Sequence, residues 1–207
     1  MTESAAHVDA GPGDPMRPGR IIVGVTGGIA AYKVASVVST LAQDGHEVTV
    51  LMTEAATRFV APLTFQALSG RPVYTSAWDH IESQDPQHIN TARRADVMLI
   101  APCTMDMLAR LAAGRADDIV SLVVSAIDRT HQPVLLAPSM NAVMWAQPAT
   151  QRNLQTLHRD RFRILEPGVG WQACRTDGVG RLPEPDDLVA AVRAALADRR
   201  GRAGKSP

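Results

Sequence analysis

Short apolar runs alternate with longer amphipathic segments along most of this chain. Residues 20–25 form an apolar run that the turn Thr26-Gly27-Gly28 ends, a pattern typical of a buried parallel strand. Residues 29–43 follow with apolar positions at helical spacing, and Asp44-Gly45 marks the end of that helix. The strand–turn–helix order then repeats, which predicts parallel strands joined by helical crossovers.

The same pattern predicts the remaining elements. Strands are expected at residues 47–52, 95–101, 133–137 and 162–165. Helices are expected from Ala61-Pro62, with proline in the first turn, and at residues 105–113, 117–126, 151–158 and 185–197. The predicted fold class is α/β, a doubly wound, mostly parallel sheet flanked by helices in a Rossmann-like arrangement.

The two ends of the chain lack this periodicity. Residues 1–18 are rich in Gly, Ala, Pro and Asp, so we expect a disordered leader there. Residues 19–197 are expected to form a single domain, and residues 198–207 a flexible tail. The first residues include acidic ones and no apolar segment, so they do not predict a secretory signal.

Composition excludes several classes of function. Of the 207 residues, 21 are Lys or Arg and 21 are Asp or Glu, and this balance gives no reason to expect a nucleic acid or a membrane as partner. No apolar run approaches the roughly 20 residues of a spanning helix. The chain has only two cysteines, Cys103 and Cys174, so we expect no disulfide framework and a cytoplasmic location. Nothing in the sequence indicates a metal site.

Four loops follow the predicted strands and should share one rim of the sheet, where such folds bind ligands. They are Thr26-Gly27-Gly28, Thr53-Glu54-Ala55, Pro102-Cys103-Thr104 and Pro138-Ser139-Met140-Asn141. Glycines allow close approach of the backbone, and a helix N-terminus favours phosphate. A mononucleotide phosphate could therefore bind the amides of Gly27 and Gly28 and the hydroxyl of Thr53. The alternative is a tight strand-to-helix turn without a ligand.

Two further segments and one histidine carry chemically active groups. Residues 138–145 read Pro-Ser-Met-Asn-Ala-Val-Met-Trp, and residues 170–174 read Gly-Trp-Gln-Ala-Cys. His88 stands in His-Ile-Asn-Thr-Ala, just before the third long strand. Together they supply an amide, a thiol and an imidazole, which suffice for acid–base chemistry on one small substrate. In these motifs, Pro-x-Met-Asn-x-x-Met-Trp and His-Ile-x-x-Ala, the chain resembles the flavin-dependent cysteine decarboxylases over residues 21–195.

The resemblance implies bound flavin mononucleotide (FMN). It assigns the cofactor to the rim loops, through Gly27, Gly28, Ile29, Thr53, Thr104, Met105, Asp106 and Ser139. Many members of the family carry Asn where this chain has Asp106. A carboxylate cannot donate a hydrogen bond as an amide does. Asp106 therefore either accepts from the cofactor or faces elsewhere.

The resemblance also implies the catalytic roles. His88 is the expected base in the oxidation of the substrate thiol, and Cys174 the expected acid in the return step. Asn141 is expected to anchor the substrate carboxylate, and Met144, Ala173 and Arg175 complete the expected substrate site. The alternatives are that Asn141 only caps a turn and that Cys174 is a small buried residue. Relatives usually have Gly at the position of Arg175, and the glycines of residues 168–180 suggest a lid.

Within the family the resemblance is strongest to the enzymes that convert 4'-phosphopantothenoylcysteine to 4'-phosphopantetheine in coenzyme A biosynthesis. Such an enzyme would be a homo-oligomer, a trimer or a dodecamer, in which His88 of one subunit acts beside Cys174 of another. It would stand alone or work with a separate synthetase. The alternatives are decarboxylation of C-terminal peptide cysteines, flavin prenyl transfer, a non-catalytic flavin-binding regulatory subunit and a plain nucleotide-binding module.

Overall fold

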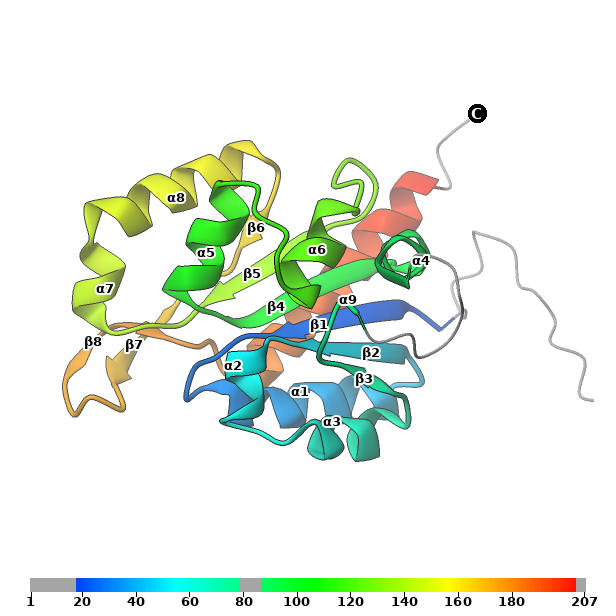
Figure 1. The fold of residues 1–207 in the computed structure, drawn as a ribbon, viewed down its shortest axis with the longest axis horizontal. Helices are drawn as coiled ribbons and strands as arrows, with labels where there is room; N and C mark the ends of the chain where they lie inside the picture. Colours follow the sequence, from blue (N-terminus) through cyan, green and yellow to red (C-terminus); the bar gives the residue numbers. More distant parts are fainter. Residues whose placement is uncertain (1–17, 79–86, 204–207) are drawn as a thin grey trace, which may run out of the picture.

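A six-stranded parallel sheet forms the centre of the molecule in the computed structural model, which describes residues 18–78 and 87–203 (Figure 1). The strand order is β3-β2-β1-β4-β5-β6. The strands are β1 (Arg20–Val25), β2 (Glu47–Met52), β3 (Val73–Tyr74), β4 (Val97–Cys103), β5 (Val134–Pro138) and β6 (Arg163–Ile164). Every residue of β4 and β5 is buried, as expected for central parallel strands covered on both faces.

Helices cover both faces of this sheet. The helices are α1 (Ala31–Gln43), α2 (Glu54–Thr57), α3 (Pro62–Ser69), α4 (Gln87–Arg94), α5 (Met105–Ala112), α6 (Ile119–Ser125), α7 (Ala142–Ala146), α8 (Pro148–Arg159) and α9 (Pro185–Ala203). One apolar cluster packs α1, α3 and α9 against the sheet, and a second packs α4, α5, α6 and α8 against the other face. The predicted doubly wound α/β fold is therefore confirmed.

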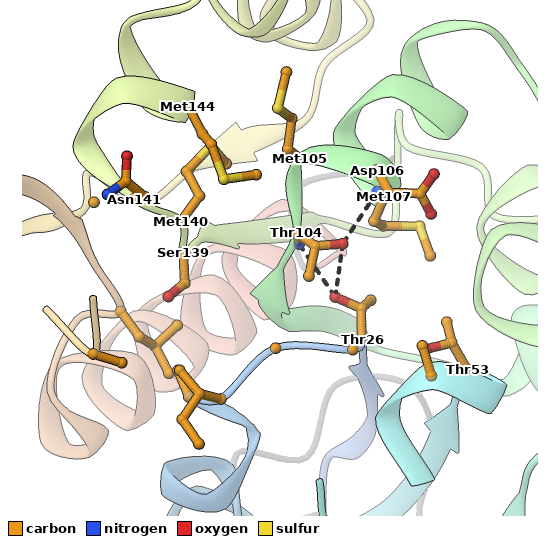
Figure 2. A pocket seen from close by; sticks show the side chains of 18 of the residues that line it. Thr26, Thr53, Thr104, Met105, Asp106, Met107, Ser139, Met140, Asn141 and Met144 are labelled. Carbon is orange, nitrogen blue, oxygen red and sulfur yellow. Dashed lines mark hydrogen bonds between the residues drawn. The ribbon is translucent and has the colours of Figure 1, made fainter. Parts of the chain in front are cut away.

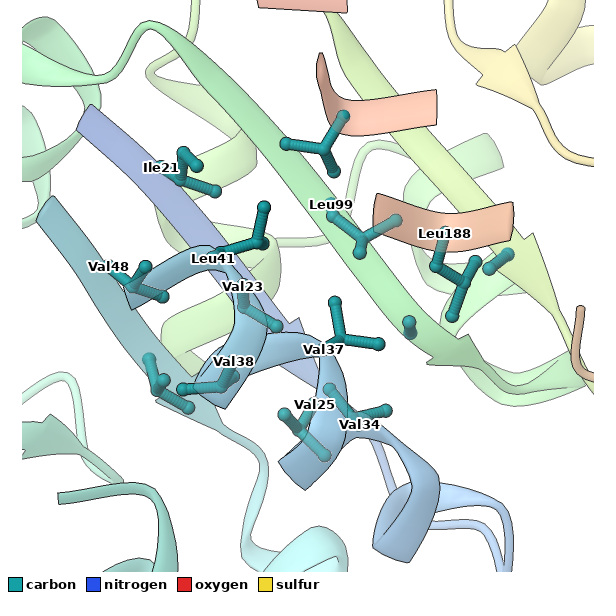
Figure 3. Packing of buried hydrophobic residues seen from close by; sticks show 14 of the residues in the cluster. Ile21, Val23, Val25, Val34, Val37, Val38, Leu41, Val48, Leu99 and Leu188 are labelled. Atoms are coloured by element: carbon teal, nitrogen blue, oxygen red, sulfur yellow. The ribbon is translucent and has the colours of Figure 1, made fainter. Parts of the chain in front are cut away.

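The spacing of apolar residues explains how α1 lies on the sheet. Val34, Val37, Val38 and Leu41 recur at intervals of three and four residues, so they share one face of the helix. All four are fully buried and meet alternate residues of β1, among them Val23 (Figure 3). This contact fixes the direction in which the first turn of α1 points, toward the carboxyl end of β1.

The strand order reverses at β1, which lies between β2 and β4. The helix after β1 packs on one face of the sheet and the helix after β4 packs on the other. The loops after β1 and β4 therefore part at the carboxyl edge of the sheet, and this is the place where doubly wound folds bind ligands. The fold thus predicts the position of the site before any side chain is considered.

A β-hairpin, β7 (Gly168–Trp171) and β8 (Asp177–Arg181), stands apart from the sheet. It is docked onto the loop after β5, since the amide of Met140 donates to the carbonyl of Gly180 at 2.9 Å. A Cβ added at Gly180 would lie 2.1 Å from the Met140 carbonyl oxygen, so only glycine permits this approach. The segment in which the glycines suggested a lid forms this β-hairpin.

The two ends of the chain were expected to lack regular structure. Helix α9 continues beyond Ala197 to Ala203, so the first part of the expected tail is helical. Ion pairs of Asp198 with Arg163 and of Arg199 with Asp96 hold this extension against the sheet. The expected leader lies outside the described residues, apart from Pro18.

Candidate active site

A cavity of about 1080 Å³ opens at the carboxyl edge of the sheet. All four rim loops predicted from the sequence contribute to its walls, which confirms that they lie together. In Figure 2 the side chains of Thr26 and Thr104 meet at the centre, with Asn141 and Met144 on one side and Thr53 on the other. The docked hairpin adds Trp171 and its neighbours to the wall.

The glycine loop after β1 packs closely against α2. A Cβ added at Gly27 would lie 2.4 Å from Cβ of Ala55, a distance that real structures do not tolerate. The amide of Gly28 donates to the carbonyl of Thr26 at 2.9 Å, so it is already partnered. The N-cap residue of α1, Ala30, has no side-chain cap within the described chain. The amides of Ala31 and Lys33 in the first turn donate to the carbonyls of Gly28 and Ala30 at 2.9 and 3.0 Å. The start of this 13-residue helix still lines the cavity, and its dipole favours phosphate there.

Three threonine hydroxyls fix the loops around this turn. The hydroxyl of Thr26 donates to the carbonyl of Pro102 at 2.6 Å and accepts from the amide of Thr104 at 3.1 Å, which ties the loops after β1 and β4 together. Thr104 caps α5 and Thr53 caps α2, each by accepting an amide at 3.3 Å. Both still line the cavity, so each hydroxyl can also donate to a ligand.

Asp106 lines the cavity but is paired with protein. Its carboxylate accepts from Nε of Arg110 at 2.7 Å, one helical turn further along α5. Arg110 also contacts Asp117 at 2.6 Å and Asp118 at 3.6 Å. The carboxylate thus faces a guanidinium in this structure, and this wall of the cavity carries more carboxylates than cations.

Asn141 and Cys174 meet at the mouth of the cavity although they are distant in sequence. The side-chain Nδ2 of Asn141 donates to Sγ of Cys174 at 3.0 Å, while Oδ1 accepts from the amide of Val143 at 2.7 Å and caps α7. The cap fixes which end of the amide faces the thiol. The same side chain thus caps α7 and contacts the thiol in the cavity, so the cap does not exclude the predicted role in the site.

The surroundings of Cys174 favour its thiolate. A hydrogen bond with the hydroxyl of Thr176, at 3.0 Å, and the bond from Asn141 lower the pKa of the Cys174 thiol below its usual value. Cys174 is exposed, which excludes the alternative of a small buried residue. The contrast is Cys103, which is fully buried in β4 and whose thiol pKa is raised by burial. Only Cys174 is therefore suited to proton transfer.

Most of the expected site residues lie on this cavity. Those that line it are Gly27, Gly28, Ile29, Thr53, Thr104, Met105, Asp106, Ser139, Asn141, Met144, Ala173 and Cys174. Two do not. His88 is half-buried on α4, which in Figure 1 lies at the opposite end of the molecule from the hairpin.

Arg175 is the other expected residue outside the lining of the cavity. It lies at the tip of the hairpin with φ of 65°, the left-handed region in which glycine is most easily accommodated. This backbone conformation gives a physical reason for the glycine that relatives usually carry at the position.

Gln172, Lys33 and Arg181 are among the cavity residues that the sequence analysis did not assign to the site. Gln172 is buried beneath the hairpin, where it donates to the carbonyl of Val179 at 3.0 Å and accepts from the amide of Ala142 at 3.2 Å. Lys33 and Arg181 line the wall beside it. Lys33 could have been predicted to face the cavity, because it lies in the first turn of α1, four residues after Ile29 and so on the same side of the helix.

The arrangement combines an anion-binding helix start, an apolar-lined cavity and an exposed thiol of lowered pKa. Among the described residues no three His, Cys, Asp or Glu side chains are grouped so as to hold a metal ion. Within the same residues, no helix is both long and apolar enough to span a bilayer. The cavity fits a phosphorylated cofactor with an apolar ring system beside a small substrate that exchanges a proton.

Comparison with known proteins agrees with this geometry. The family model described as Flavoprotein matches residues 12–197. The coenzyme A biosynthesis bifunctional protein CoaBC of Mycolicibacterium smegmatis is 45% identical over 177 residues, which cover 86% of this chain. The chain spans only 42% of the length of that relative.

Solved structures share the fold across their whole length. A PPC decarboxylase mutant complexed with pantothenoylaminoethenethiol superposes with a TM-score of 0.79 at 27% identity, covering 86% of this chain and 98% of the other. The FMN-dependent cysteine decarboxylase SpaF superposes with a TM-score of 0.74 at 31% identity, covering 87% of this chain and 97% of the other.

Proposed function

The chain belongs to the flavoprotein family, and from that premise we propose that it is an FMN-dependent decarboxylase of 4'-phosphopantothenoylcysteine, which it converts to 4'-phosphopantetheine in coenzyme A biosynthesis. The observation that carries the proposal is the contact of Asn141 with Cys174 on a cavity that the start of α1 also lines. The identity to a coenzyme A biosynthesis protein supports the pathway. The cytoplasm is the proposed location.

The residues present fit FMN. Gly27 lets the loop after β1 pack directly against Ala55, and the start of α1, whose dipole favours a phosphate, lines the same cavity. Thr53 and Thr104 would donate to phosphate or ribityl oxygens. Met105 and Ile29 would contact the ring system. When bound, FMN supplies a hydride acceptor for the carbon that bears the substrate thiol, and later the donor that returns the hydride.

Asn141 can hold the substrate carboxylate without fixing it by charge. Its NH₂ group has two N–H bonds, of which one goes to Cys174, so one remains for the carboxylate. A neutral donor positions the carboxylate while leaving it free to depart as carbon dioxide, because no salt bridge has to be broken. The oxidised substrate carries a C=S group beta to the carboxylate, so the electron pair released by decarboxylation moves onto sulfur.

Cys174 can then supply the proton for the final step. The return of the hydride requires a proton at the carbon next to it, and a thiol of lowered pKa donates it more readily. The hydrogen bonds from Thr176 and Asn141 stabilise the thiolate that remains. The ligand of the solved relative agrees with this order, since an aminoethenethiol is a cysteine that has lost its carboxylate and two hydrogens.

His88 would complete the site from a second subunit. Because it lies outside the cavity of its own chain, it can act as the base on the substrate thiol only where a neighbouring copy presents it. A homo-oligomer, a trimer or a dodecamer, is therefore part of the proposal. Large apolar side chains are exposed beside the cavity and on α3, among them Ile29 at 59%, Tyr32 at 60% and Leu63 at 69% exposure. Such exposure supports contact of this surface with another subunit.

The experiment is mass spectrometry of the purified protein after incubation with 4'-phosphopantothenoylcysteine, with the visible spectrum recorded first. A flavin spectrum and the loss of one carbon dioxide from the substrate would support the proposal. A flavin-containing protein that leaves this substrate unchanged, but decarboxylates a peptide ending in cysteine, would favour the peptide-modifying alternative. A flavin-containing protein inactive on both would favour the regulatory subunit.

A further inference from the structure

Three cationic side chains line the cavity, and they differ in how far they are neutralised. Arg110 lies within 4 Å of three carboxylates, those of Asp106, Asp117 and Asp118. These three carboxylates would repel an anionic group of a ligand at that wall. The other two cations, Lys33 on α1 and Arg181 on β8, lie together elsewhere on the lining.

Lys33 and Arg181 share one carboxylate, that of Glu184. The Nζ atom of Lys33 lies 2.9 Å from Oε2, and Nη2 of Arg181 lies 2.8 Å from Oε1. Glu184 does not line the cavity, so it pairs with both cations without itself facing a ligand there. Two positive charges and one negative charge leave this wall with an excess positive charge. The side chains of Lys33 and Arg181 are 19% and 36% exposed, so neither charge is fully screened by water.

The hairpin places Arg181 at a defined separation from the reactive thiol. Arg181 pairs with Gly168 at the base of the hairpin, whereas Cys174 lies at its tip. A Cβ at Gly170 would lie 2.9 Å from Nη1 of Arg181, so the guanidinium lies against the strand on the cavity side. Arg181 lies four residue steps beyond Asp177 along β8, a rise of about 13 Å, and the turn that carries Cys174 adds to this distance.

We propose that Lys33 and Arg181 form the subsite for the 4'-phosphate of the substrate, an inference that rests on the proposed function. Thirteen bonds join phosphorus to sulfur in 4'-phosphopantothenoylcysteine, and three bonds of an extended chain span ~3.8 Å, so the molecule reaches about 16 Å. That length matches the separation of the base of the hairpin from its tip. With the thiol beside Cys174, the phosphate reaches the guanidinium and the ammonium, both of which favour phosphate oxygens.

This subsite would select phosphorylated substrates over peptides. A peptide that ends in cysteine carries no dianion at that distance from its thiol, so it would leave the excess positive charge unmatched. Glu184 keeps the two cations in place in the absence of substrate and offsets part of their mutual repulsion. The same wall therefore gives a physical basis for distinguishing the leading function from the peptide-modifying alternative.

The test compares two substrates, 4'-phosphopantothenoylcysteine and pantothenoylcysteine, in Arg181→Gln and Lys33→Gln variants of the FMN-loaded protein. For the phosphorylated substrate we expect kcat/KM to fall about 10- to 100-fold, mainly through KM, because a charge-assisted hydrogen bond is lost. For pantothenoylcysteine we expect little change. Arg181→Lys, which keeps the charge, should recover part of the phosphate preference. Arg193→Gln is the matched control, because it removes an arginine in the middle of α9 that pairs with Asp44 at the end of α1 and does not line the cavity.

Several outcomes would overturn the subsite. Equal losses for both substrates would assign Lys33 and Arg181 a structural role, and loss of bound FMN from the variants would assign them to the phosphate of the cofactor. Unchanged kinetics for both substrates would mean that the substrate phosphate binds elsewhere, and would also refute the assignment of Lys33 and Arg181. A wild-type protein that decarboxylates neither substrate would overturn the proposed function and the subsite together, which distinguishes the two failures.

Discussion

The amide of Asn141 donates to the sulfur of Cys174 at 3.0 Å across 33 residues of sequence. The bond joins the N-cap of α7 to the tip of the β7–β8 hairpin, and buried Gln172 fastens the hairpin to the same loop. The group that would anchor a carboxylate is thus held directly beside the group that would donate a proton.

This contact predicts a measurable change in thiol acidity. Asn141→Ala removes one donor to the thiolate, so the pKa of the Cys174 thiol should rise toward its ordinary value. The rate of alkylation by iodoacetamide follows the thiolate fraction, and its pH profile should therefore shift to higher pH. Thr176→Val should act in the same direction and more strongly, because the bond with Thr176 is the larger cause of the lowered pKa.

The other thiol of the chain, that of Cys103, should contribute no background to this measurement. Cys103 is fully buried, so it should react with the reagent only after unfolding. Profiles of Asn141→Ala and wild type that coincide would mean that the contact does not influence the thiol in solution.

Cys174→Ser should separate the first half of the reaction from the second. A serine hydroxyl is a far weaker acid than a thiol of lowered pKa, so oxidation and decarboxylation should proceed while the final reduction stalls. We expect formation of 4'-phosphopantetheine to fall at least about 100-fold, the usual contribution of a general acid. Mass spectrometry should detect a decarboxylated product that lacks two hydrogens. Normal turnover by this variant would remove Cys174 from the mechanism.

His88→Asn should prevent the first oxidation, and mixing should reveal where His88 acts. If each site combines His88 of one subunit with Cys174 of the next, oligomers co-expressed from His88→Asn and Cys174→Ser chains contain some sites with both native residues. Random assembly should restore roughly a quarter of wild-type activity, although each variant alone is inactive. Mixed oligomers without activity would mean that both residues act within one chain.

The sequence sufficed for five of the six strands of the sheet and for the four loops that meet at the cavity. The apolar run before Thr26 and the helical spacing after it are local signals, and parallel strands necessarily bring their carboxyl ends to one edge. The loops that hold Thr53, Thr104 and Asn141 could therefore be placed together without a structure. The identity of the catalytic groups came from motif resemblance rather than from periodicity.

The elements that were missed lack an apolar signature. The hairpin is rich in glycine, and its apolar side chains Val169, Trp171 and Val179 occupy exposed positions, so it has no buried apolar stripe. Helix α4 buries only Ala92, and its charged residues gave no helical apolar stripe. The pairing of Lys33 with Arg181 through Glu184 depends on the docking of that hairpin, so no local pattern could predict it.

Gly27→Ala should impair cofactor binding through packing alone. The added Cβ would lie 2.4 Å from Cβ of Ala55 and 3.1 Å from its backbone carbon, so the loop after β1 and the start of α2 must move apart. Overpacking of this kind costs about 1–3 kcal/mol of stability, and the displaced amides should weaken FMN binding. Gly28→Ala is the matched control for stability, because its nearest contact would be an ordinary 3.5 Å from Thr104. Denaturant unfolding and flavin fluorescence titration measure the two effects. Equal stability of the two variants would mean that Ala55 yields to the methyl group at no cost.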